Sequence, residues 1–126
     1  MAVKKQSILV LDDNRDAADT LAALLASEGH AVRPAYSVRD ALDVLDDDPG
    51  IAAVLADIRM PDVDGFDFLR VVRLRRPSVN VILITGHAIT EEDVVPRGAT
   101  VLQKPVALPA LLKALASGDA RDAERG

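Results

Sequence analysis

Short runs of apolar residues alternate with segments of helical periodicity along this chain, and the alternation repeats five times. Most of the runs are continuously apolar, as strands are when helices cover both faces of a parallel sheet. The predicted strands are residues 8–11, 31–35, 53–56, 79–84 and 101–103. Five strand-helix units predict an α/β fold, a doubly wound (βα)5 parallel sheet in which the first, third and fourth strands are central.

The amount of apolar material limits the chain to one domain. It has 126 residues, of which 49% are hydrophobic, and this supplies one ordinary core without room for a second. The absence of cysteine excludes disulfides and thiolate metal sites and fits a cytoplasmic location.

Charge and hydropathy also limit the classes of partner. A net charge of −5 with aromatic residues only at Tyr36, Phe66 and Phe68 argues against direct binding of nucleic acid, which needs basic patches or stacking rings. No apolar run approaches the roughly 18 residues of a membrane span. We therefore expect neither nucleic acid nor membrane as a direct partner.

The helical segments carry start and stop signals. Asn14 is suited to cap the first helix and Gly29 to end it. Ser37 begins a sequence that resembles a capping box for the second helix. The third helix is expected to stop before Pro77 and the last to begin near Pro109.

Two segments depart from this regularity. The fourth crossover, "TEEDVVPRG" at residues 90–98, has barely one turn before Pro96, which predicts a shortened or irregular fourth helix. The last ten residues, "SGDARDAERG" at 117–126, lack an apolar stripe. They are expected to be a mobile tail or the start of a linker.

Polar residues interrupt the apolar pattern where the predicted strands end. They are Asp12, Asp13, Asp57, Thr85 and Lys104. The carboxyl ends of parallel strands share one edge, and a flavodoxin-like strand order of 2-1-3-4-5 would put Asp57 at its centre. The last strand lies two strands away, so that the long stem of Lys104 is needed to reach this point.

Three carboxylates at one point would repel one another unless a cation shared the site, and oxygen ligands favour Mg²⁺. Lys104 would add a positive charge for anionic oxygens, and Thr85 a hydroxyl. A cation, hydrogen-bond donors and a positioned nucleophile are what phosphoryl transfer requires. Asp57 is the candidate nucleophile, since a carboxylate can form an acyl phosphate.

Four motifs, "LVLDDN", "LADIRMPDVDG", "VILITGHA" and "LQKPV", resemble the receiver domain of two-component response regulators. The resemblance covers residues 6–116, which would be the receiver domain. It implies a phosphorelay module that accepts a phosphoryl group from a sensor histidine kinase or a histidine phosphotransfer protein and signals to an unknown downstream protein. Such a domain catalyses only its own phosphorylation and dephosphorylation and is otherwise no enzyme.

The resemblance assigns roles to particular residues. Asp57 matches the phosphoacceptor, while Thr85 and Lys104 match the hydroxyl and lysine that assist it. A cis peptide bond before Pro105 is also implied. The implied ligands of Mg²⁺ are Asp12, Asp13, Asp57 and the backbone carbonyl of Arg59.

The chain departs from the family pattern in two ways. Val101 stands where an aromatic residue is usual, so a signal that rotates an aromatic side chain is not available. The spacing from Thr85 to Lys104 is shorter than usual, in keeping with the short fourth crossover. His87, two residues after Thr85, could modulate the phosphoryl group, although a loop histidine is more often simply solvated.

The sequence leaves two other functions open. The first is a pseudo-receiver that binds a partner constitutively without phosphorylation, against which the complete acidic set argues. The second is a phosphohydrolase with an aspartyl nucleophile, although that class resembles a D-x-D arrangement on the first strand. Here the acids after the first strand are adjacent, Asp12 and Asp13.

Overall fold

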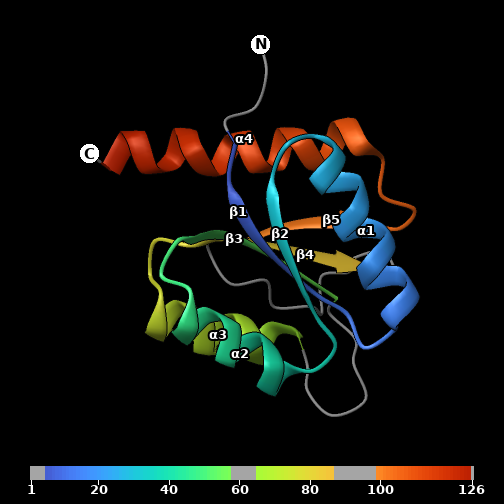
Figure 1. Ribbon diagram of the computed structural model, residues 1–126. Coiled ribbons are helices and arrows are strands. Elements are labelled where there is room, and N and C mark those ends of the chain that lie inside the picture. The colour runs from blue at the N-terminus through green and yellow to red at the C-terminus, as the bar shows by residue number, and fades with distance from the viewer. Residues whose placement is uncertain (1–4, 58–64, 87–98, 126) are drawn as a thin grey trace.

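The computed structural model describes residues 5–57, 65–86 and 99–125, and in these ranges five parallel strands form one sheet (Figure 1). The strand order is β2-β1-β3-β4-β5, which confirms the predicted flavodoxin-like order 2-1-3-4-5. The elements are β1 (Ser7–Leu11), α1 (Arg15–Ser27), β2 (Ala31–Ala35), α2 (Val38–Asp47), β3 (Ile51–Asp57), α3 (Gly65–Arg75), β4 (Asn80–Thr85), β5 (Ala99–Gln103) and α4 (Leu108–Arg125).

Helices cover both faces of the sheet, with α2 and α3 on one side and α1 and α4 on the other (Figure 1). On the α2 and α3 side, the ring of Phe68 is fully buried and packs in one cluster with Leu83 of β4. On the other side, Leu55 of β3 joins Leu25 and Leu111. Successive strand residues point to opposite faces, so β3 must be apolar along almost its whole length.

The predicted helix caps are confirmed. The side chain of Asn14 accepts a hydrogen bond of 3.1 Å from the backbone N–H of Ala17. The hydroxyl oxygen of Ser37 accepts one of 3.1 Å from the N–H of Asp40. Gly29 follows α1 with a φ of 94°, a conformation that favours glycine at the end of a helix. These caps determine where α1 and α2 leave the sheet edge.

The guanidinium of Arg76 forms hydrogen bonds with the segment that connects α2 to β3. It donates hydrogen bonds to the carbonyl oxygens of Leu45, Asp48, Pro49 and Ile51, at 3.1, 3.3, 2.9 and 2.7 Å respectively. A planar group with five N–H donors can bond several carbonyls at once, which a lysine ammonium cannot do in this geometry. Arg76 thereby ties the end of α3 to the start of the central strand.

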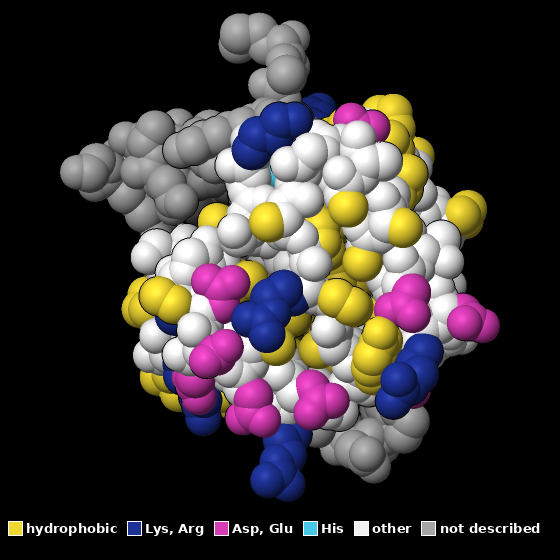
Figure 2. Space-filling model, viewed as in Figure 1, with side chains coloured by type: hydrophobic (Ala, Val, Ile, Leu, Met, Phe, Trp, Pro, Cys, Tyr) yellow, Lys and Arg dark blue, Asp and Glu magenta, His cyan; other side chains and the backbone are white. Residues whose placement is uncertain are grey.

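Acidic and basic side chains are interspersed over the face on which α2 lies (Figure 2). Arg75 is 2.7 Å from a carboxylate oxygen of Asp46, and Arg33 is 3.7 Å from one of Asp47. These pairs are largely exposed, and exposed ion pairs contribute little to stability.

The C-terminal helix is longer than the sequence pattern predicts. α4 continues to Arg125 and extends beyond the edge of the sheet (Figure 1). Residues 117–125 are therefore helical. The mobility of this tail and the domain boundary at 116 stay predictions. The predicted shortening of the fourth helix concerns residues 87–98, which lie outside the described residues.

Among the helices described, none is long and apolar enough to span a bilayer.

Candidate active site at the carboxyl edge of the sheet

Three carboxylates meet at the carboxyl edge of the sheet. Asp12 and Asp13 follow β1, and Asp57 is the last residue of the neighbouring strand β3. Each offers an oxygen, and these three oxygens lie within 4.8 Å of one another. The side chains of Asp12 and Asp57 are 13% and 14% exposed, whereas Asp13 is exposed. The pairing of β1 with β3 therefore brings together the acidic residues that the sequence singled out.

Backbone hydrogen bonds hold Asp12 at the turn from β1 into α1. Its N–H donates to the carbonyl of Ala35 at 3.1 Å, which continues the pairing with β2 by one residue. Its carboxylate accepts a 3.0 Å hydrogen bond from the N–H of Asn14. Because Asn14 itself caps α1, the acidic pair and the start of the helix form one rigid turn.

The environment of Asp12 disfavours its charged form. Burial raises the pKa of this carboxyl above its ordinary value of 3.8, the hydrogen bond from Asn14 lowers it, and the negative charge of Asp57 raises it further. The positive charge of Lys104 acts in the opposite direction, but the net direction is upward. A bound cation would relieve this unfavourable arrangement of charge.

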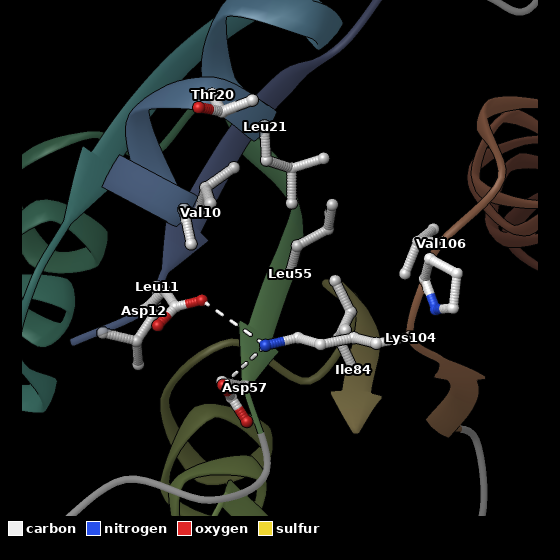
Figure 3. Close-up of a pocket in the computed structure, with 12 residues that line it drawn as sticks. Val10, Leu11, Asp12, Thr20, Leu21, Leu55, Asp57, Ile84, Lys104 and Val106 are labelled. Atoms are coloured by element: carbon white, nitrogen blue, oxygen red, sulfur yellow. Dashed lines mark hydrogen bonds and ion pairs between the residues drawn. The ribbon is translucent and has the colours of Figure 1, made fainter. Parts of the chain in front are cut away.

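Lys104 follows the edge strand β5, and its long side chain reaches Asp57 at the end of β3, two strands away. Its ammonium nitrogen is 3.1 Å from an oxygen of Asp57 and 3.9 Å from an oxygen of Asp12 (Figure 3). The Lys104 N–H donates to the carbonyl of Thr85 at 2.7 Å, so that the chain stays beside β4 for one residue beyond β5. The Lys104–Pro105 peptide bond is cis, as the resemblance implies.

Thr85 ends β4, the strand between β3 and β5. In the register of the sheet Asp57 is opposite Ile84, so Thr85 lies one position further toward the site edge. Only 3% of the residue is exposed. Thr85 is thus on the strand next to Asp57, on the same side of the central strand as Lys104.

Two predicted residues lie outside the described part of the chain. They are Arg59, whose carbonyl is an implied metal ligand, and His87, the candidate modulator. Their roles stay predictions.

A pocket of about 620 Å³ lies next to the charged cluster. The sequence pattern did not predict it. We call it the side pocket; it is lined by residues of β1, α1, β3, β4 and the segment after β5, namely Val10, Leu11, Asp12, Ala17, Thr20, Leu21, Leu55, Asp57, Ile84, Lys104, Pro105 and Val106. Leu21 belongs to the apolar stripe of α1, which a sequence pattern can only assign to the core. That Leu21 and Val106 line the same pocket depends on how α1 packs relative to the segment after β5.

The donor set fits a hard divalent cation. Three negative carboxylates face one ammonium, so the cluster carries an excess of negative charge. All of the side-chain donors in this group of carboxylates are oxygens, which Mg²⁺ prefers to the nitrogen and sulfur ligands of transition metals. Asp12, Asp13 and Asp57 are the residues suited to hold such an ion.

Comparison with protein families finds one model that matches most of the chain. The model of the response regulator receiver domain matches residues 8–116. Response regulator MprA from Mycolicibacterium vanbaalenii is 34% identical over 108 residues, which are 83% of this chain and 46% of the relative. The chain thus spans less than half the length of this curated relative.

Solved structures share the whole fold. A receiver domain from Clostridium thermocellum superimposes with a TM-score of 0.87 at 29% identity, covering 96% of this chain and 99% of that one. A CheY-like receiver domain from Methanospirillum hungatei gives a TM-score of 0.86 at 27% identity, covering 98% and 100%. In both comparisons the similarity extends over nearly all of each chain.

Proposed function

Because the chain belongs to the response regulator receiver domains, we propose that Asp57 accepts a phosphoryl group from a histidine of a sensor kinase or phosphotransfer protein, with Mg²⁺ bound. One observation carries the proposal: the ammonium of Lys104, which follows β5, and the carboxylates of Asp12 and Asp13, which follow β1, converge on Asp57 at the end of β3. A purely structural role would not need three acids at one sheet edge, since their mutual repulsion destabilises the fold.

Asp57 is the residue placed to be the nucleophile. One of its carboxylate oxygens would form a bond to phosphorus while the P–N bond to the donor histidine breaks. The side chain is held at the end of the central strand and is 14% exposed, so a donor can reach it from the sheet edge. Its central position is what separates it from the other two acids.

The neighbouring groups would position the phosphoryl oxygens. Lys104 supplies a positive charge 3.1 Å from Asp57, and Thr85 on the adjacent strand supplies a hydroxyl. When bound, Mg²⁺ would neutralise negative charge that develops on the phosphoryl group. Asp12, Asp13, Asp57 and the backbone carbonyl of Arg59 would hold the ion.

The chain would act as a signalling module and catalyse only its own phosphorylation and dephosphorylation. A cytoplasmic location and an unidentified downstream protein belong to the same proposal. A phosphorelay of this kind needs neither nucleic acid nor membrane as a direct partner of this domain. The excess of acidic residues in the chain agrees with a protein partner.

Intact-mass measurement tests the proposal. Incubation with acetyl phosphate or phosphoramidate and Mg²⁺ should add one phosphoryl group, and fragmentation should map it to Asp57. Asp57→Ala should abolish the adduct, whereas the control Asp43→Ala, an exposed acid on α2, should leave it intact. An undiminished adduct in Asp57→Ala, mapped to another residue, would refute the assignment.

Adduct formation, Mg²⁺ titration and an assay of phosphate release together separate the alternatives. A constitutive pseudo-receiver would bind no Mg²⁺ and form no adduct with either donor. A phosphohydrolase would release phosphate from a phosphomonoester over many turnovers. We expect neither result.

A further inference from the structure

The side pocket joins an apolar chamber to the charged cluster. Leu55 and Ile84 rise from the sheet, Leu21 descends from α1, and Val106 closes the side (Figure 3). The stem of Lys104 runs along the edge of this chamber, and its ammonium lies between Asp12 and Asp57 (Figure 3). One end of the pocket is therefore charged, and the rest is lined by apolar residues apart from Thr20.

The apolar residues that line the chamber differ in their exposure to solvent. Val10, Leu55 and Ile84 are 1%, 0% and 6% exposed and form the floor. Leu21 and Val106 are half-buried and form walls of the pocket. A volume of about 620 Å³ lies within the range of small-molecule sites, about 300–1,000 Å³.

We propose that the side pocket binds the apolar acyl group of a low-molecular-weight acyl phosphate, and so makes aryl or branched acyl phosphates better phosphodonors than acetyl phosphate. The inference rests on the proposed function of Asp57. The chemistry follows from the two ends of the pocket: a phosphoryl group belongs beside Lys104, and a group without hydrogen-bonding atoms belongs among Leu21, Leu55 and Val106.

The transfer step needs no further reactant. A carboxylate oxygen of Asp57 forms a bond to phosphorus, and the bond between phosphorus and the acyl oxygen breaks. The electron pair of that bond leaves with the acyl group as a carboxylate anion. No proton has to be moved, so the apolar chamber needs no acid or base.

Non-reactive analogues test binding separately from transfer. Phenylphosphonate and methylphosphonate have a P–C bond that cannot transfer the group, and each is titrated with Mg²⁺ while methyl NMR signals are followed. Phenylphosphonate should bind about tenfold more tightly, because the ring leaves water on entering the chamber. It alone should shift the methyl signals of Leu21, Leu55 and Val106.

Phosphorylation rates provide the second measurement. Benzoyl phosphate should modify Asp57 about tenfold faster than acetyl phosphate at low donor concentration, although benzoate and acetate are leaving groups of similar basicity. Ala17→Phe, which fills the chamber from α1, should bring this ratio close to one. The control Ala23→Phe adds the same ring at an exposed position of α1 and should keep the ratio.

The outcomes distinguish the two levels of the proposal. Equal affinities for the two phosphonates, or an equal rate ratio in the native chain and in Ala17→Phe, would overturn the role of the side pocket alone. Failure of both donors to modify Asp57 would overturn the phosphoacceptor assignment itself. The phosphonate titration uses the native chain, so it decides the matter even if Ala17→Phe does not fold.

Discussion

The ammonium of Lys104 lies 3.1 Å from a carboxylate oxygen of Asp57, although 47 positions separate the two residues in the chain. The same ammonium is 3.9 Å from Asp12, so one cation partly balances two partly buried acids. This pairing determines how the site should respond to mutation, pH and Mg²⁺.

Lys104→Met should slow phosphorylation of Asp57 about a hundredfold, the size of effect found when one donor to a transition state is lost. It should also destabilise the Mg²⁺-free protein by about 1 kcal/mol or less, since Lys104 is 43% exposed and the pair is partly screened. Rates from intact mass and urea unfolding at neutral pH measure both effects. The control Lys113→Met, at an exposed position of α4 away from the site, should leave the phosphorylation rate unchanged.

Asp13→Ala should weaken Mg²⁺ binding about tenfold and slow phosphorylation, while the metal-free fold survives. Asp13 is exposed, and its removal relieves repulsion from the two neighbouring acids, so the stability without metal should not fall. Calorimetric Mg²⁺ titration of this variant and of Asp16→Ala, an exposed acid in the first turn of α1, makes the comparison. Equal Mg²⁺ affinity in the two variants would mean that Asp13 belongs only to the turn.

Asp12→Asn should stabilise the metal-free protein at neutral pH. Because burial raises the folded-state pKa of Asp12, the contribution of this carboxyl to stability is greatest below the ordinary value of 3.8 and declines as pH rises through the folded pKa. Asparagine cannot ionise, and its oxygen can still accept the hydrogen bond from Asn14.

The stability difference between Asp12→Asn and the native chain should therefore be largest at neutral pH and vanish near pH 3. Thermal unfolding in EDTA across this range measures it. Added Mg²⁺ should stabilise the native chain more than the variant. A difference that does not change with pH would contradict the assigned direction of the shift.

Arg76→Lys should destabilise the fold by about 2 kcal/mol, because an ammonium cannot satisfy four carbonyls placed around a planar guanidinium. Arg75→Lys is the matched control, since within the described part of the chain the neighbouring Arg75 makes only an exposed ion pair with Asp46. Its replacement should cost less than about 0.5 kcal/mol. Urea unfolding of both variants gives the comparison. Similar losses in the two would show that the carbonyl network contributes little.

The response to phosphorylation should centre on residues 86–98. Val101 is half-buried against the cluster of α2 and α3, and a β-branched side chain has little rotamer freedom with which to transmit a signal. The sequence of residues 86–98 combines glycines, a proline and few apolar residues, which favours a segment of low stability. Amide exchange with beryllofluoride should change most there; a larger change in α1 or α4 would contradict this route.

Local sequence signals determined where most elements begin and end. Asn14 and Ser37 cap their helices as predicted, because a cap needs only a side chain and a backbone N–H two or three residues later. The continuous apolar runs of β3 and β4 identified the central strands, since a strand covered on both faces is mostly apolar. The sequence pattern did not predict that α4 continues to Arg125, because its last residues carry no apolar stripe.

The alternation of elements also determined which polar residues share an edge, because parallel strands place all their carboxyl ends on one side. Only the tertiary structure decided the distance from Lys104 to Asp57, the burial that raises the pKa of Asp12, and the side pocket that Leu21 and Val106 line. Each depends on how elements far apart in the chain pack against one another. Periodicity reports which face of a helix is apolar, but the space left between two apolar faces is set by their mutual packing.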